Sequence, residues 1–142
     1  MIRDTEPFRR SVSTRWSDND MYGHLNNNVY YSAMDTVINT WLIDEAGLDP
    51  LGGPALGVCV SSGLHFKQSA SFPEEIAVEL AVGRIGTSSV TWTPRILRVV
   101  DNAELATGEF VTVFIDRSGR RPVAIPTGIR IAIESAFAVP QI

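Results

Sequence analysis

Apolar side chains recur every three or four positions between Asn27 and Ala46, a segment that contains no glycine or proline. This spacing is the period of an α-helix with one apolar face. Asn26–Asn28 are suitable N-caps, and Gly47 followed by Pro50 is typical of a helix end. The segment is therefore predicted to be one long helix, whose apolar face consists of Tyr30, Ala33, Met34, Val37, Ile38, Trp41 and Leu42.

The rest of the chain has a different pattern, in which apolar residues alternate with polar ones or form short β-rich runs. Such runs, bounded by turn residues, indicate strands. Pro94 interrupts one of them, which indicates an edge position or a bulge at that point. The predicted strands are Phe8–Trp16, Gly57–Gln68, Glu75–Arg84, Ser88–Val100 and Glu104–Ile115, and a short final helix is predicted from Pro126 to about Ala136.

The order of these elements is one strand, a long helix and then several strands joined by mostly short turns. Short connections imply antiparallel neighbours. A sheet with one apolar face has to cover that face, and the early helix is the long amphipathic element available for it. We therefore expect an α+β fold in which an antiparallel sheet wraps around a central helix, with residues 1–142 forming a single domain. One helix cannot cover both edges of the sheet, so copies are expected to associate through it.

Composition and charge narrow the possible functions. Hydrophobic residues make up 44% and charged residues 20% of the 142 positions, which is typical of a globular protein. The net charge of -4 argues against nucleic-acid binding through a basic surface. No apolar run approaches the ~20 residues of a membrane span, and residues 1–7 carry no apolar signal segment, so a cytoplasmic location is expected. The single cysteine, Cys59, lies in an apolar run and is predicted to be a small core residue.

The residues with the clearest chemical potential lie between Asp18 and Asn28, immediately before the predicted helix. A helix N-terminus presents free backbone N–H groups and a partial positive charge, which can polarise a carbonyl. Asp20 and His24 beside it are suited to act as nucleophile, base or acid in acyl transfer or hydrolysis. Taken singly, either Asp is more typical of a loop or a cap. A metal site is not expected, because no further ligand lies near these residues.

This segment resembles the signature of the 4-hydroxybenzoyl-CoA thioesterase-like family, in the run Asp18-Asn19-Asp20-Met21-Tyr22-Gly23-His24-Leu25-Asn26-Asn27 followed by Tyr30-Tyr31 and Asp35-Thr36. The end of the chain, through Gly119-Arg120-Arg121-Pro122, is similar to the family as well, so the resemblance covers nearly the whole sequence. It implies the hotdog fold, an antiparallel sheet around a long helix, with copies paired into homodimers or tetramers. It also implies hydrolysis of an acyl-CoA thioester, with coenzyme A as part of the substrate and no separate cofactor.

The resemblance implies roles for three residues. Asp20 matches the aspartate that family members use as nucleophile or general base, and the backbone N–H near Asn27 falls where they polarise the thioester carbonyl. His24 matches a histidine of relatives that include plant acyl-carrier-protein thioesterases, where it acts with an Asp and an Asn. The position of that Asn is Tyr22 here. Two roles for His24 therefore remain open, which are acid–base assistance and holding the loop.

Substrate-binding residues are expected on the helix, on the strand after it and in a later turn. The candidates for an acyl pocket between the helix and a strand of a partner subunit are Tyr30, Met34, Trp41, His65 and Phe66. Plain core packing is the alternative for each, and for Met34 and Trp41 it is the better explanation. Small residues and hydroxyls allow a phosphate to approach backbone N–H groups, and an arginine adds charge. On this basis the candidates for binding coenzyme A are Arg84, Gly86, Thr87, Ser88 and Ser89, for which a simple hairpin turn is an equally good explanation.

The leading prediction is an acyl-CoA thioesterase that releases a free carboxylic acid and coenzyme A. One alternative is a non-catalytic acyl-CoA-binding hotdog protein, which has no need of the Asp20 carboxylate. A second is an acyl-carrier-protein thioesterase, which the tyrosine at position 22 makes less favourable. Assays with CoA and carrier-protein substrates separate these possibilities.

Overall fold

The computed structural model describes residues 6–140, in which a long and a short helix accompany a set of strands. Residues 1–5, which belong to the N-terminal segment expected to lack a signal sequence, lie outside this range, as do residues 141–142. No helix in the described part is long and apolar enough to cross a membrane. In chain order the elements are β1 Arg9–Val12, the 3-10 turn η1 Trp16–Asp18, α1 Asn27–Asp44, β2 Ala55–Phe66, β3 Ile76–Glu79, β4 Val82–Ile85, β5 Ser89–Trp92, β6 Arg95–Arg98, β7 Glu104–Asp116 and α2 Thr127–Ala136.

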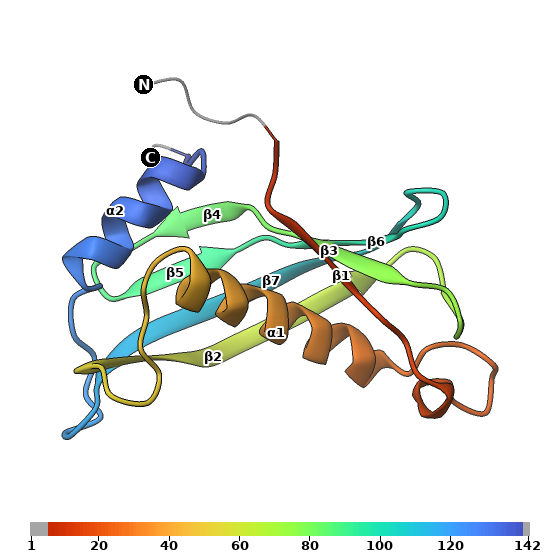
Figure 1. The fold of residues 1–142 in the computed structure, drawn as a ribbon, viewed down its shortest axis with the longest axis horizontal. Helices are drawn as coiled ribbons and strands as arrows, with labels where there is room; N and C mark the ends of the chain where they lie inside the picture. The colour runs from red at the N-terminus through yellow and green to blue at the C-terminus, as the bar shows by residue number, and fades with distance from the viewer. Residues whose placement is uncertain (1–5, 141–142) are drawn as a thin grey trace.

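The strands form one seven-stranded antiparallel sheet, across which helix α1 lies (Figure 1). Strand β7 is the centre of this sheet. One edge of β7 pairs with the whole length of β2. The other edge pairs with β6 and then, further along β7, with β5. Beyond β6 the sheet continues through β3 to β1, and beyond β5 it continues to β4. The predicted arrangement, an antiparallel sheet associated with a long early helix, is confirmed.

Two predicted strands, Glu75–Arg84 and Ser88–Val100, are each divided into two shorter strands. The second division falls at Pro94, which has no N–H group to continue a ladder. The first division lies beside it, because the N–H of Thr93 donates to the Ala81 carbonyl at 2.8 Å. The two breaks therefore separate the β3–β6 ladder from the β4–β5 ladder. The strand predicted over Phe8–Trp16 is also shorter, since β1 ends at Val12 and the chain then enters η1.

Helix α1 begins at Asn27, as predicted, and ends at Asp44, two residues before the predicted end. Asn26 is its N-cap, and the side-chain oxygen of Asn26 accepts a hydrogen bond from the Asn28 N–H at 3.0 Å. Full burial of one large apolar side chain contributes about 1.5–3 kcal/mol, so the buried face of the helix explains why it stays on the sheet. All seven residues of the predicted apolar face are buried, namely Tyr30, Ala33, Met34, Val37, Ile38, Trp41 and Leu42.

Aromatic packing closes the core at the C-terminal end of α1, where α2 lies beside β4 and β5 (Figure 1). The ring of Trp41 is 5.0 Å from that of Phe137 and 5.7 Å from that of Trp92, measured between ring centroids. Tilted and edge-on arrangements such as these are favourable for aromatic rings. The buried Trp92 Nε1–H donates to the Thr112 hydroxyl at 3.1 Å, so this polar group is satisfied inside the core.

Strand β2 is an edge of the sheet, because within residues 6–140 it pairs with β7 alone. Its register shifts between Cys59 and Ser61, which marks a β-bulge. Cys59 is exposed, so the prediction that it is a core residue is wrong. Its apolar neighbours suggested burial, but they lie on an edge strand, and Val60 beside it is 59% exposed. A twelve-residue edge leaves backbone N–H and C=O groups available to another strand.

Candidate active site

The segment before helix α1 forms a tight loop around Asp20. The backbone N–H of Asp20 donates to the His24 carbonyl at 2.8 Å, and the N–H of Gly23 donates to the Asp20 carbonyl at 3.1 Å. Gly23 has a φ of 80°, which favours a residue without a side chain. The N–H of Tyr22 donates to Oδ1 of Asp20 at 2.9 Å. The other carboxylate oxygen, Oδ2, accepts no hydrogen bond within residues 6–140.

The two aspartates of this loop have different surroundings. Asp18 is 5% exposed, and its carboxylate accepts three hydrogen bonds from Arg15, from the backbone N–H and from the guanidinium. The Asp18 carbonyl accepts the Asn26 N–H at 2.8 Å, which ties the start of the loop to its end. Asp20 is instead partly exposed and lines a pocket. A capping role therefore describes Asp18, and Asp20 is the carboxylate available for chemistry.

This pocket has a volume of about 370 Å³ and lies between the loop, the first turns of α1 and the residues after β2. All three predicted catalytic residues line it, which are Asp20, His24 and Asn27. Two of the predicted substrate-binding residues, Tyr30 and Phe66, line it as well. The remaining lining residues are Tyr22, Leu25, Lys67, Gln68 and Ser69. Of these, the last three lie just past β2, where no local motif points to a site.

The N-terminus of α1 supplies the pocket with a backbone donor. The N–H of Asn28 is used by the Asn26 side chain, and the N–H of Val29 donates to the Asn26 carbonyl at 2.9 Å. The N–H of Asn27, by contrast, has no acceptor within the described part of the chain. Because it sits at the positive end of the helix dipole, this group can stabilise negative charge that develops on a carbonyl oxygen.

Two aromatic rings form one wall of the pocket. Tyr30 and Phe66 pack edge to face, with ring centroids 5.1 Å apart and an angle of 83° between the planes. Tyr30 is 2% exposed, and this burial raises the pKa of its hydroxyl, an effect that a backbone hydrogen bond at Ala70 partly offsets. The tyrosine therefore stays neutral, and the wall suits the hydrocarbon part of a ligand.

Lys67, which lines the pocket, belongs to a network of ion pairs. Nζ of Lys67 is 2.5 Å from Oε1 of Glu104, and Nε of Arg95 is 2.7 Å from Oε2 of the same carboxylate. Arg95 also pairs with Glu79 at 2.9 Å. Hydrogen bonds from Lys67 and Arg95 hold the pKa of Glu104 below its ordinary value. The network therefore holds the ammonium of a lysine that lines the pocket.

The sequence from residue 14 to residue 133 matches the thioesterase-like superfamily. The chain belongs to this superfamily. Among solved structures, the PA5185 protein from Pseudomonas aeruginosa is 40% identical and has a TM-score of 0.87, with 94% of each chain covered. None of the curated proteins matches the sequence.

Two more distant structures share this fold, and one is a CoA thioesterase while the other is a complex with CoA. A 1,4-dihydroxy-2-naphthoyl-CoA thioesterase from Synechocystis is 18% identical, with a TM-score of 0.80 over 90% of this chain and 96% of that one. A Staphylococcus aureus protein in complex with CoA is 13% identical, with a TM-score of 0.84 over 99% of this chain and 91% of that one. These likenesses confirm the α+β hotdog fold. The narrower resemblance to 4-hydroxybenzoyl-CoA thioesterases stays a prediction.

Some of the residues expected in the site of this thioesterase-like protein lie elsewhere in the chain. His65 precedes Phe66 on β2 and does not line the pocket, since adjacent strand residues point to opposite faces. The predicted coenzyme A turn, Arg84 with Gly86–Ser89, joins β4 to β5 beside α2 (Figure 1). Its carbonyls accept hydrogen bonds from the C-terminal segment, at Thr87 from Ile125 and at Gly86 from Arg130. Within one chain, this turn and the pocket are at opposite ends of α1.

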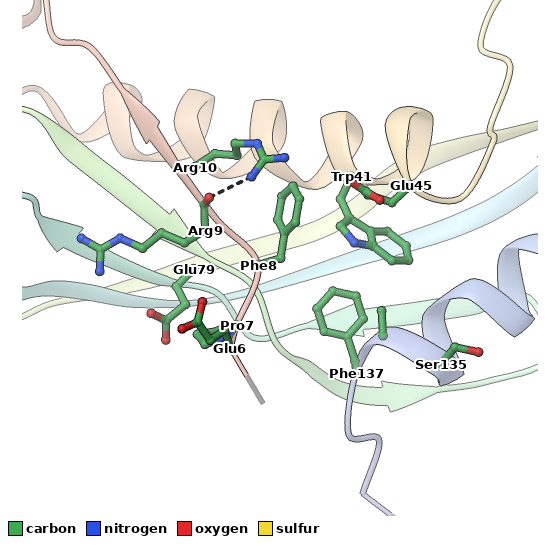
Figure 2. Close-up of a pocket in the computed structure, with 11 residues that line it drawn as sticks. Glu6, Pro7, Phe8, Arg9, Arg10, Trp41, Glu45, Glu79, Ser135 and Phe137 are labelled. Atoms are coloured by element: carbon green, nitrogen blue, oxygen red, sulfur yellow. Dashed lines mark hydrogen bonds between the residues drawn. The ribbon is translucent and has the colours of Figure 1, made fainter. Parts of the chain in front are cut away.

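A larger pocket of about 740 Å³ lies at that opposite end, between the start of β1, the last turn of α1 and the end of α2. Figure 2 shows the rings of Phe8, Trp41 and Phe137 gathered around it. The Arg10 guanidinium lies over the Phe8 ring, 4.1 Å from the centroid. Of the predicted site residues only Trp41 lines this pocket, and none of the predicted catalytic residues does, so it is not the candidate active site. Within residues 6–140, no group of three His, Cys, Asp or Glu side chains is placed to hold a metal ion.

Proposed function

We propose that this protein is an acyl-CoA thioesterase in which Asp20 is the nucleophile or the general base. One observation carries the proposal: Asp20, His24 and the N-terminus of α1 line a single pocket that also has an aromatic wall. Membership of the thioesterase-like superfamily supports the reaction class. The distant CoA thioesterase and the distant complex with CoA support a CoA thioester as the substrate.

The reaction places the thioester carbonyl at the start of α1. The Asn27 N–H and the helix dipole stabilise the oxyanion that forms when the carbonyl carbon is attacked. Oδ2 of Asp20, which is not engaged by the loop, either attacks this carbon directly or takes a proton from a water molecule that attacks it. In the first route, water then hydrolyses the acyl–aspartate anhydride. Both routes release a carboxylic acid and the thiol of coenzyme A, which is a good leaving group.

A homodimer through β2 completes this proposal. Two copies that pair antiparallel along this edge bring the Ala55 end of one β2 beside the Phe66 end of the other. Ala55 pairs with Asp116 at the end of β7, and the start of β5 pairs near the same end, at Val113. The turn after Arg84 therefore lies at the Ala55 end of its own copy. In the dimer, this is the same end of the combined sheet as the pocket of the other copy. This arrangement gives the predicted coenzyme A turn a way to reach the substrate.

The test is thiol release from a panel of acyl-CoAs, from short to long and aliphatic to aromatic, by the wild type and by Asp20→Ala. We expect the wild type to hydrolyse at least one of them and Asp20→Ala to lose about 10²–10⁴-fold in turnover. Asp44→Ala is the matched control, because Asp44 is exposed at the far end of the same helix, and it should keep wild-type turnover.

Wild-type turnover in Asp20→Ala would remove Asp20 from the mechanism. If the wild type hydrolyses no acyl-CoA but binds one tightly, the protein is an acyl-CoA-binding protein and not a hydrolase. A preference for acyl groups on a carrier protein would redirect the proposal to that class of thioesterase.

A further inference from the structure

A second segment of the chain, immediately after β2, is hydrogen-bonded to the loop that carries Asp20. The side chain of Asn19 makes two of these bonds: Nδ2 donates to the Ser71 Oγ at 3.1 Å, and Oδ1 accepts the Phe72 N–H at 3.0 Å. The Ser71 hydroxyl in turn donates to the Gly23 carbonyl at 2.7 Å. Asn19 and Ser71 are here called the clasp. Their hydrogen bonds hold the loop at Asn19, next to Asp20, and at Gly23, next to His24.

The clasp is anchored to the sheet. The N–H of Ser71 donates to Oε1 of Glu74 at 2.8 Å, and Oε2 of Glu74 is 2.9 Å from Nε of Arg98 on β6. Arg98 also donates to the Ser69 carbonyl at 2.8 Å, and its side chain is 15% exposed. On the other side, the hydroxyl of Thr14 donates to the Glu74 carbonyl at 2.8 Å. Ser71 thus sits on a segment that is held at several points, and its hydroxyl connects that segment to the loop.

The loop has need of such support. Apart from the Tyr22 N–H, no group in the described residues donates to the Asp20 carboxylate, and His24 is exposed. The attacking oxygen has to lie within about 0.5 Å of its productive position, and a misplacement of about 1 Å costs roughly 10²-fold in rate. We propose that the clasp of Asn19 and Ser71 sets the position of Asp20 relative to the N-terminus of α1. This inference rests on the proposed thioesterase function.

The variant that tests the clasp is Ser71→Ala, which removes the acceptor of Asn19 and the donor to Gly23 together. We expect kcat to fall at least tenfold while KM stays within about threefold, because the clasp lines no part of the pocket. Ser71→Thr keeps the hydroxyl and should restore most of kcat. Ser118→Ala is the matched control, since within residues 6–140 the Ser118 hydroxyl bonds only to Asp116, in a turn at the other end of β7.

A second readout does not depend on activity. Amide hydrogen exchange at Asp20, Gly23 and Leu25 reports whether the loop stays closed, because these N–H groups donate within the loop or to Ala70. Ser71→Ala should exchange at least tenfold faster at these amides and at the wild-type rate in the middle of α1. If this variant does not fold, Asn19→Ala removes the bond between Asn19 and Ser71 together with the bond from the Phe72 N–H, and it should also speed exchange at these amides.

The outcomes separate the two proposals. A hydrolytic wild type, with kcat and loop exchange both unchanged in Ser71→Ala, overturns the role of the clasp. A second outcome is that the wild type hydrolyses no thioester, yet its loop amides exchange slowly and lose this protection in Ser71→Ala. That result supports the clasp and refutes the proposed function. If Ser71→Thr is as impaired as Ser71→Ala, the hydroxyl is not what positions the loop, and the inference fails.

Discussion

Gly108 lies in β7 under helix α1, at a point where a side chain has no space. A methyl group on Gly108 would lie 2.9 Å from Sδ of Met34, 3.0 Å from Cδ2 of Leu64 and 3.2 Å from Cγ of Pro94. These distances are shorter than ordinary carbon contacts of about 3.5–4.0 Å. Met34 is completely buried, and the Gly108 N–H donates to the Pro94 carbonyl at 2.8 Å. The side chains of Met34 and Leu64 therefore have to repack to make space for the added methyl group.

We expect Gly108→Ala to destabilise the protein. Adding a methyl group to a filled core costs about 1–3 kcal/mol, and the lower flexibility of alanine in the unfolded chain offsets about 0.4–1 kcal/mol. A net loss of about 1–2 kcal/mol lowers Tm by about 3–7 °C, because the unfolding entropy is roughly 2.1 cal/mol/K per residue. Thermal and urea denaturation followed by circular dichroism measure both values.

Gly63→Ala is the matched control for this prediction. Gly63 lies on the neighbouring strand, opposite Glu109, and a methyl group there would meet no atom of residues 6–140 within 4 Å apart from its chain neighbours. Its replacement by alanine should change the stability by no more than about 0.5 kcal/mol. If Gly108→Ala is as stable as Gly63→Ala, the side chains around Gly108 move aside without cost, and the reasoning that this part of the core is filled is refuted.

The helix cap and the ion pairs of Glu104 give two further predictions. Asn26→Ala should lower the free energy of unfolding, measured by urea denaturation, by about 1 kcal/mol, because the Asn28 N–H loses its acceptor. Asn28→Ala should leave it unchanged or raise it slightly. Equal losses in the two variants would contradict the cap. The folded pKa of Glu104 lies below its ordinary 4.5, so its charge stabilises the fold above that pH, and this stability is lost as the pH falls through the folded pKa. The Tm of Glu104→Gln should therefore fall less than the Tm of the wild type between about pH 6 and about pH 3. The same dependence of Tm on pH in both proteins would contradict this.

Local patterns were sufficient to predict α1. The helical spacing of its apolar residues and its cap all lie within one continuous segment, and the structure begins the helix at Asn27 as expected. The division of the strands was harder to predict, since the alternation of apolar and polar residues continues through residues 75–84 without a break. Whether a strand ends there depends on pairing with Phe8 and Thr93, which lie far away in the sequence. Pro94 was the one local signal of a break, and it indicated the right place.

The same distinction applies to Cys59. An apolar run is equally compatible with a central strand and with an edge strand, and only the order of strands in the sheet separates them. The bulge next to Cys59 is also invisible in the sequence, because it depends on the register against β7. Burial was therefore the wrong expectation for a residue whose neighbours in sequence are hydrophobic.

The candidate site has a local part and a distant part, and this explains which residues the sequence revealed. Asp20, His24 and Asn27 lie within eight positions, so one continuous motif contains the carboxylate, the imidazole and the helix N-terminus. Ser71 is 52 positions away from Asn19, its hydrogen-bond partner, and a lone serine in a loop carries no signal of that contact. The chemistry is thus encoded next to the helix, whereas its support comes from a segment that only the folded sheet brings close. Substitutions in that segment are expected to change the rate without touching the substrate, which sequence motifs alone do not anticipate.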